Sequence, residues 1–287
     1  MDKPRKDNQG IVLPFPFIFT LRFLEFINSY LGMRLAAFFF AKPFKYKIPQ
    51  REIPVLSAAK KSSVYIKSID KSVCLYQWSG KGPKIMLLHG WSGRASNFFK
   101  IIEKLIIEDY DVYAFDAPAH GESSGVTTNL PEFIHCLQTL IDKRGPFEAI
   151  VGHSGGGFAS TYVVAHNPTI KKLILISPFD KVIDVFEKYF DLIQLGTKGR
   201  KLMVQYFNHK TGKKIEELSS SILAQSIKGR SLLIHDENDR EVSFSDGVNI
   251  HKNFTNSTLF VTKGLGHRRI LRDVEVINQL VNFLKII

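Results

Sequence analysis

The sequence predicts an α/β fold in which a mostly parallel central sheet is flanked by helices. From residue 84 onward, short apolar runs alternate with amphipathic stretches of helical length, which is typical of parallel strands joined by crossover helices. Two earlier runs, at residues 63–69 and 73–78, are separated by a short Asp-Lys turn and predict a hairpin at the sheet edge. A Gly-rich turn at residues 152–156 joins an apolar run to a helical one.

This alternation assigns most of the chain. Strands are expected at residues 84–88, 111–115, 148–152, 172–176, 231–235 and 258–261. Helices are expected at residues 96–107, 155–166 and 271–284, around 131–142 and near 244–253. The alternation lapses between about residues 179 and 228, where we expect a small helical cap insertion. The predicted organisation is an N-terminal amphipathic helical arm over residues 1–61 and one domain over residues 62–287 that carries the cap.

The composition is that of a globular chain. Of its 287 residues, 44% are hydrophobic and 23% are charged, which allows a sizeable buried core. The two cysteines, Cys74 and Cys136, fall on different expected elements, so the fold does not depend on disulfides. A reducing compartment is the default for such a chain, and we therefore expect a cytoplasmic protein.

The positive charge is concentrated near the N-terminus. The formal net charge is +12, and residues 1–61 hold eleven Lys or Arg residues against four Asp or Glu residues. A basic surface can serve nucleic acid, an anionic membrane or solubility alone. Neither a zinc-finger spacing nor an RNA-binding signature accompanies the charge, so we expect no nucleic-acid partner.

Residues 11–41 are strongly apolar but repeatedly interrupted. The breaks fall at Pro14, Pro16, Arg22, Glu25 and Arg34, so no run reaches the roughly 20 residues that span a bilayer. Residues 17–40 instead predict one or two amphipathic helices with Arg flanks. Three uses fit such helices: packing on the main domain, dimerisation with a second subunit, and peripheral contact with a membrane surface.

The sequence GHSGG at residues 152–156 matches the pattern G-x-S-x-G, between an expected apolar strand and a small-residue helix start. A serine on such a sharp turn projects its hydroxyl above the sheet, and Gly152 and Gly156 avoid clashes that side chains would make around it. The pattern therefore predicts Ser154 as a nucleophile. The alternative is an ordinary Gly-rich turn between a strand and a helix.

Residues 84–287 resemble the α/β-hydrolase fold family. The resemblance rests on HGW at residues 89–91, DAPAHGES at residues 116–123 and GHSGG at residues 152–156, in the family's order. It implies a serine hydrolase whose oxyanion hole is formed by the backbone N–H groups of Trp91 and Gly155. Asp116 and His120 are expected to tie the turn beside the oxyanion loop rather than to act in catalysis.

The family order of nucleophile, acid and histidine directs the choice of base. The histidines that follow the nucleophile's helix are His209, His235, His251 and His267. The first three fall in the cap, in an expected strand and in an expected helix, respectively. His267 follows a Gly-Leu-Gly loop directly after the last strand, so we expect it to be the general base.

The acid is expected after the strand at residues 231–235. The family pattern there is H-G-x-x-D, and this chain has Asp236 in place of the glycine and Asp239 at the acid's position. The spacing favours Asp239, with Asp236 as the second candidate. The acid's role is to hold the imidazole tautomer and to stabilise the imidazolium.

These residues predict hydrolysis of a carboxylic ester or thioester through an acyl-enzyme, with a small-molecule ester as substrate. The apolar cap and arm suggest a lipid-like ester. Amide hydrolysis, peptide hydrolysis and carbon–carbon bond hydrolysis use the same constellation, and a non-catalytic scaffold on this fold is a further alternative. No nucleotide loop and no metal-ligand spacing is present in the sequence, so we expect neither a cofactor nor a metal.

Overall fold

The computed structural model describes residues 15–286. The chain divides into two compact units. Of the described residues, one unit contains residues 15–40 together with Val182–Glu217, and the other contains Ala41–Lys181 and residues 218–286. The first part of the expected arm and most of the expected cap therefore form one unit, while residues 41–61 belong to the unit that contains the sheet.

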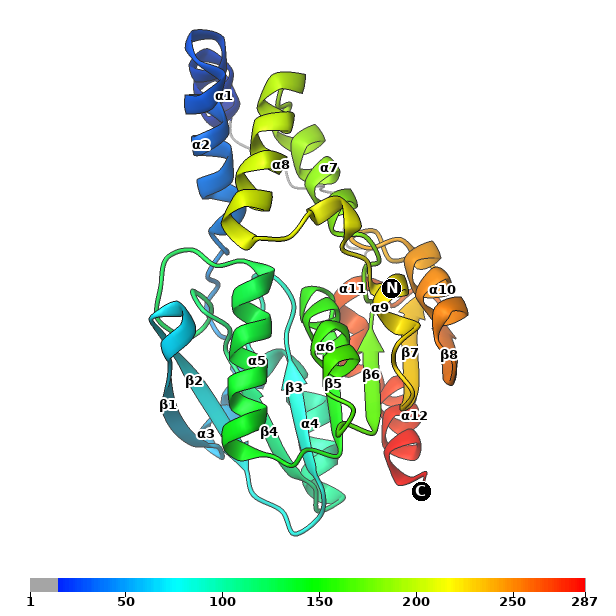
Figure 1. Ribbon diagram of the computed structural model, residues 1–287. Helices are drawn as coiled ribbons and strands as arrows, with labels where there is room; N and C mark the ends of the chain where they lie inside the picture. Colours follow the sequence, from blue (N-terminus) through cyan, green and yellow to red (C-terminus); the bar gives the residue numbers. More distant parts are fainter. Residues whose placement is uncertain (1–14, 287) are drawn as a thin grey trace, which may run out of the picture. The chain divides into compact units, whose positions relative to one another are not determined.

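Within the described residues the sheet has eight strands (Figure 1). They are β1 (Lys60–Ile66), β2 (Lys71–Trp78), β3 (Lys84–Leu88), β4 (Asp111–Phe115), β5 (Ala149–His153), β6 (Lys172–Ile176), β7 (Arg230–Asp236) and β8 (Ser257–Thr262). Their spatial order is β1-β2-β4-β3-β5-β6-β7-β8. All pairs from β4 to β8 are parallel, and β2 pairs antiparallel with both β1 and β4. The predicted parallel sheet with an antiparallel edge is confirmed.

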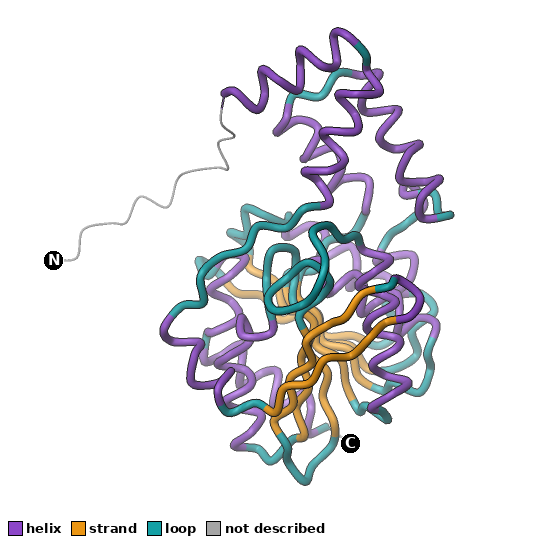
Figure 2. Tube along the Cα trace, turned by 90° about the vertical axis from the view of Figure 1, so that its left-hand side faces the viewer, coloured by secondary structure: helices purple, strands orange, loops and turns teal. Residues whose placement is uncertain are grey.

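Helices cover both faces of this sheet (Figure 2). Apolar side chains of α3 (Ile53–Ser57), α4 (Phe99–Ile107) and α12 (Val274–Lys285) form a core on one face. Those of α5 (Leu130–Arg144), α6 (Gly155–His166), α9 (Ser220–Ala224) and α10 (Phe244–Asn253) form a core on the other. A parallel sheet requires this double covering, because its strands are apolar on both sides.

Local capping fixes several helix starts. Asn129 accepts a hydrogen bond from the Glu132 amide at the start of α5, and Asp273 accepts hydrogen bonds from two amides at the start of α12. The short helix α11 (Gly266–Arg269) follows β8, and 3₁₀ turns occupy Gln50–Glu52, Lys67–Ile69, Ala95–Phe98, Ile215–Glu217 and Ile270–Arg272.

The smaller unit consists of two helix pairs, α1 (Phe15–Ile27) with α2 (Ser29–Ala41) and α7 (Val182–Ile193) with α8 (Thr197–Thr211) (Figure 1). The Phe40 ring contacts Phe186, Tyr189 and Phe207, with ring centroids 4.5–5.6 Å apart. Both carboxylate oxygens of Glu25 accept from the Gly196 amide at 3.1 Å. None of the helices within residues 15–286 is both long and apolar enough to cross a bilayer.

Candidate active site

Ser154 lies on a strained turn between β5 and α6. Its backbone adopts φ 53° and ψ −120°, a region that costs a non-glycine residue roughly 1–3 kcal/mol. The Ser154 amide donates to the Ile176 carbonyl at 3.0 Å, and the Ser154 carbonyl accepts from the Phe158 amide at 3.2 Å. The first bond ties the turn to the adjacent strand β6, and the second ties it to the first turn of α6. Together they stabilise the strained conformation of Ser154.

The flanking glycines leave the space that this turn needs. A Cβ atom on Gly152 would lie 2.6 Å from Ser160 Oγ, and one on Gly156 would overlap the backbone carbonyl oxygens of Leu88 and His89. Gly90 approaches from the neighbouring loop so closely that its Cβ would lie 2.8 Å from the Ser154 Cβ. A side chain at Gly90 or Gly156 would therefore push the turn away from the end of β3, and one at Gly152 would push it away from α6.

The Trp91 and Gly155 amides belong to two segments that meet beside Ser154. The Trp91 nitrogen lies 3.7 Å from the position that a Cβ atom on Gly155 would occupy. Gly155 is the first residue of α6, where the helix dipole favours negative charge. The Trp91 ring lies nearly parallel to Phe133, with ring centroids 6.3 Å apart. The structure thus brings together the two segments whose N–H groups were expected to form an oxyanion hole.

Two buried histidines organise the loop that carries Trp91. His89 Nε2 accepts from the Ala117 amide at 3.0 Å, so its Nδ1 carries the proton and donates to the Gly90 carbonyl at 2.7 Å. His120 Nε2 accepts from the Ser92 amide at 2.9 Å. Burial lowers the pKa of His89 to about 4 and that of His120 to about 3. Both rings are therefore neutral at pH 7 and act as hydrogen-bonding parts of the loop.

Asp116 holds the following turn through both carboxylate oxygens. Its Oδ1 accepts from the Ala95 amide at 2.8 Å, and its Oδ2 accepts from the Tyr76 hydroxyl at 3.0 Å and the Glu122 amide at 2.9 Å. A Cβ atom on Gly121 would overlap the same carboxylate, which explains the glycine there. These contacts match the structural role expected for Asp116 from its motif.

The neutral state of His89 predicts acid sensitivity of folding. Between pH 6.5 and about 4 the unfolded chain binds a proton at this residue that the folded chain does not, so stability falls as the pH falls. We expect His89 to contribute about 2 kcal/mol to the loss between pH 7 and pH 5. Urea denaturation at both pH values measures the free energy of unfolding. The difference between the free energies at pH 7 and pH 5 should be smaller by that amount in His89→Gln. It should be unchanged in the control variant His135→Gln, whose histidine is exposed. An unchanged difference in His89→Gln would contradict the prediction.

His267 and Asp239 form a direct pair. His267 is the second residue of the short helix α11, and its Nδ1 lies 2.7 Å from Asp239 Oδ2. Asp239 Oδ1 accepts from the Glu241 and Val242 amides at 2.9 and 3.0 Å. Burial alone would raise the pKa of Asp239, but the hydrogen bond and charge of His267 and these two amides outweigh it and lower the pKa to about 2. The carboxylate is therefore ionised, and Nδ1 of His267 donates to it.

Asp236, the second candidate for the acid, has other partners. Its Oδ2 accepts from Thr262 Oγ1 at 2.8 Å and from the Leu265 amide at 2.9 Å, and its Oδ1 accepts from the Asn238 amide at 3.0 Å. The side chain is fully buried. Asp236 thus fixes the end of β8 and the residues that lead into His267, while Asp239 contacts the imidazole itself.

His153, the first variable residue of the G-x-S-x-G pattern, contacts the backbone of His267. Its Nε2 donates to the His267 backbone carbonyl at 2.9 Å, and the two rings lie 4.6 Å apart. Burial lowers the pKa of His153 well below its usual value, so the ring is neutral. This contact joins the residue before Ser154 to the backbone of His267. Sequence reasoning missed it because the two residues are 114 positions apart.

Among the hydrogen bonds of residues 15–286, none joins Ser154 Oγ to His267. A catalytic hydrogen bond is often long before substrate binds and shortens in the complex. Within residues 15–286, no three His, Cys, Asp or Glu side chains are grouped closely enough to hold a metal ion. The polar groups gathered here can perform nucleophilic attack and proton transfer.

Residues 83–194 match the profile of a family described as the alpha/beta hydrolase fold. An esterase from Pyrococcus furiosus superposes with a TM-score of 0.67, covering 85% of this chain and 98% of that structure at 20% identity. The chain has the α/β-hydrolase fold. An esterase from Exiguobacterium antarcticum shares the fold with a TM-score of 0.63 at 16% identity. The superposition covers 79% of this chain and 100% of that structure.

Curated relatives of this α/β-hydrolase-fold protein include esterases. The pimeloyl-[acyl-carrier protein] methyl ester esterase of Xanthomonas campestris is 32% identical over 98 residues, which are 34% of this chain and 38% of that enzyme. The enzyme of the same name from Vibrio vulnificus is 30% identical over 108 residues, 37% of this chain and 41% of its own. The chain thus spans about two fifths of the length of these relatives.

Proposed function

We propose that this protein is a serine hydrolase that cleaves carboxylic esters or thioesters through an acyl-enzyme. The observation that carries the proposal is the 2.7 Å contact between His267 and Asp239. It is accompanied by a hydrogen bond to the His267 carbonyl from His153, the residue before the strained Ser154. The fold and the esterase names of the relatives support the same class of reaction.

In the proposed first step, Ser154 Oγ attacks the substrate carbonyl carbon while His267 Nε2 takes the hydroxyl proton. The resulting oxyanion accepts hydrogen bonds from the Trp91 and Gly155 amides, each of which would stabilise the transition state by about 3 kcal/mol. The tetrahedral intermediate collapses, the bond to the leaving group breaks, and His267 protonates the departing alcohol or thiol. The acyl group stays on Ser154.

In the second step, water attacks the acyl-enzyme and His267 accepts its proton. Collapse of the second intermediate releases the carboxylic acid, and the same proton returns to Ser154 Oγ. Asp239 keeps Nδ1 protonated throughout, so Nε2 is free to act as base. Its lowered pKa, about 2, fits a carboxylate that stabilises the imidazolium without taking the proton.

We propose an acyl ester with an apolar chain as the substrate class. The relatives' name, which refers to a methyl ester on an acyl carrier protein, supports an acyl substrate. Among the aromatic residues of the insertion, Phe186, Phe190 and Phe207 are buried in the core of the smaller unit, where the Phe186 ring contacts the other two.

Nitrophenyl acetate, butyrate and octanoate test this substrate class. Each buried methylene is worth about 0.8 kcal/mol, so kcat/KM should rise at least about tenfold from butyrate to octanoate. Octanoate hydrolysis in Ser154→Ala provides the blank. Activity confined to acetate and butyrate would contradict an apolar acyl substrate, and faster cleavage of the matching anilides would move the proposal to an amidase.

We also propose a cytoplasmic location, because Cys74 and Cys136 are both free thiols. For the apolar segment 11–41, of which residues 15–41 are described, we propose contact with a membrane surface or with a second subunit. Either partner would cover its exposed apolar side chains.

A further inference from the structure

Helix α1 exposes a continuous apolar stripe. Phe19, Phe23, Phe26 and Ile27 have the helical spacing i, i+4, i+7 and i+8, and their exposed fractions are 61%, 54%, 89% and 59%. The opposite side of the helix contributes Leu21, which is fully buried. Helix α2 extends the apolar surface with exposed Tyr30, Leu31, Phe38 and Phe39. We call these eight side chains, together with the exposed Arg22 and Arg34, the α1–α2 face.

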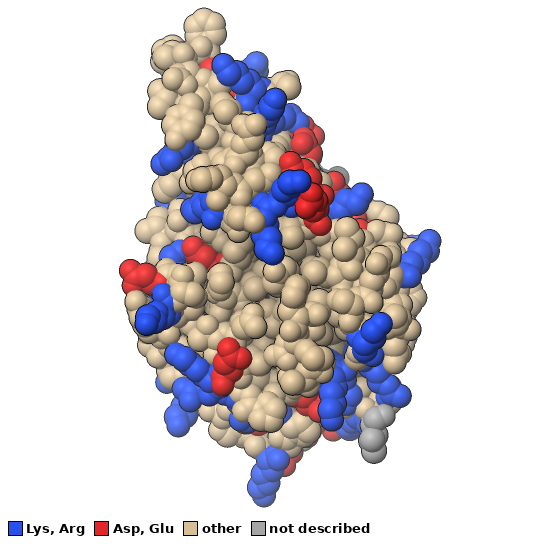
Figure 3. Space-filling view, viewed as in Figure 1, with Lys and Arg blue, Asp and Glu red and all other residues tan. Residues whose placement is uncertain are grey.

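The charges of the α1–α2 face are all positive. Residues 15–40 contain three charged side chains, Arg22, Glu25 and Arg34. Glu25 turns away from the face, where its carboxylate accepts from the Gly196 amide within the same unit. Arg22 and Arg34 are exposed. In Figure 3 the region of these two helices is mostly free of charged atoms, with Lys and Arg side chains beside it.

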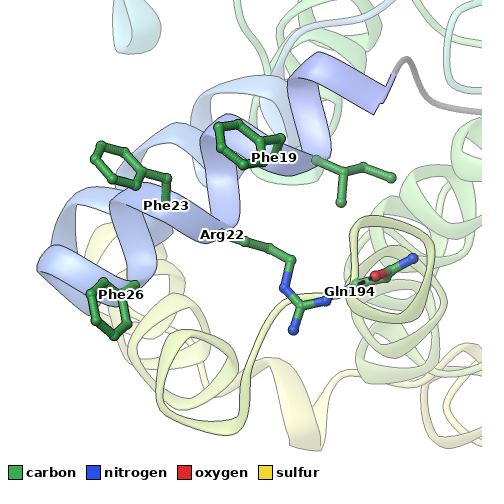
Figure 4. A pocket seen from close by; sticks show the side chains of 6 residues that line it. Phe19, Arg22, Phe23, Phe26 and Gln194 are labelled. Carbon is green, nitrogen blue, oxygen red and sulfur yellow. Dashed lines mark hydrogen bonds between the residues drawn. The ribbon is translucent and has the colours of Figure 1, made fainter.

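A hollow on this face combines aromatic rings with one of the arginines. Its volume is about 500 Å³, and it is lined by Ile18, Phe19, Arg22, Phe23, Phe26 and Gln194. Figure 4 shows Arg22 extending from α1 towards Gln194, while the three Phe rings project from the same helix. Arg22 Nη1 donates to Gln194 Oε1 at 3.3 Å, a long bond that leaves the guanidinium with further donors.

We propose that the α1–α2 face binds the surface of an anionic phospholipid bilayer. The Phe and Leu side chains enter the boundary between headgroups and acyl chains, and Arg22 and Arg34 donate to lipid phosphates. A second copy of the chain fits less well. In a two-fold symmetric dimer the same patch meets itself, so the arginines would face like charges and no exposed carboxylate on the face would neutralise them.

Vesicle sedimentation with the full chain tests this inference. Wild type should pellet with vesicles of equal phosphatidylcholine and phosphatidylglycerol, pellet much less with phosphatidylcholine alone, and be released by salt. Phe23→Ala combined with Phe26→Ala should weaken partitioning by about tenfold or more, because two exposed rings lose their insertion. Arg34→Gln should weaken binding to the anionic vesicles by about fivefold.

Matched controls separate this surface from general stickiness and from the serine chemistry. Ile107→Ala, at a residue 76% exposed on α4, should partition as wild type. Ser154→Ala should also partition as wild type, since binding does not depend on the reaction. Equal pelleting with both vesicle types, or undiminished pelleting of the double Phe variant, would overturn the proposal. The proposal would also be overturned if wild type did not bind vesicles but formed a dimer in sedimentation equilibrium, and if the double Phe variant were a monomer.

Discussion

Replacing Ser154 by Ala is expected to lower kcat for ester hydrolysis by about 10⁶-fold. The proposed mechanism passes through an acyl group on Ser154 Oγ, and removing the nucleophile of a serine–histidine pair leaves only the contribution of oxyanion stabilisation and substrate binding. Initial rates with an activated ester, at equal concentrations of folded protein, give the ratio directly.

The fold should tolerate this change, because Ser154 is only half-buried and alanine keeps its backbone bonds to Ile176 and Phe158. Circular dichroism and the midpoint of thermal unfolding check that. Ser226→Ala, at an exposed serine after α9, serves as the matched control and should keep wild-type kcat. A Ser154→Ala variant with more than a hundredth of wild-type kcat would be incompatible with the mechanism.

Asp239→Asn is expected to lower kcat by about 10⁴-fold with little loss of stability. The asparagine oxygen can still accept from the Glu241 and Val242 amides, which preserves the local turn. Its NH₂ group would face His267 Nδ1 at the present 2.7 Å contact, which favours the tautomer whose Nε2 carries the proton. His267 Nε2 then already carries a proton and cannot take one from Ser154. Kinetics and urea denaturation of the same preparation give both quantities.

Asp236→Asn makes the comparison specific. Asp236 accepts from Thr262, Leu265 and Asn238, so the amide would place donors against donors and cost about 1–3 kcal/mol of stability. Its effect on kcat should be far smaller than that of Asp239→Asn, because it contacts the loop and not the imidazole. If Asp236→Asn instead lost activity as severely while remaining stable, the acid would have to be reassigned to Asp236.

The fold could be predicted because its signals are local. Strands β3, β4 and β6 and helices α6 and α10 have the bounds that the alternation of apolar runs predicts. The hairpin is also present, although its first strand ends at Ile66, because Lys67–Ile69 form a 3₁₀ turn before the left-handed Asp70. Gly152 and Gly156 were informative because G-x-S-x-G is a local pattern, although the backbone atoms that require a glycine at residue 156 belong to the distant Leu88 and His89.

What could not be predicted depends on contacts between distant segments. The grouping of α1 and α2 with α7 and α8 rests on contacts such as those of Phe40 with Phe186 and Phe207, which no periodicity reveals. The spacing alone favoured Asp239 over Asp236, but the contact of Asp239 with His267 joins residues 28 positions apart and has no sequence signal. The bond from His153 to the His267 carbonyl has no sequence signal beyond the presence of a histidine in the motif.

Fluorophosphonate labelling followed by peptide mapping tests the central claim most directly. The probe reacts with serines whose hydroxyl is activated by a neighbouring base. We expect wild-type protein to carry the label on Ser154, and both Ser154→Ala and His267→Ala to lose it while remaining folded. Folded wild-type protein that takes up no label, or that takes it up on another residue, would contradict the assignment of Ser154 and His267.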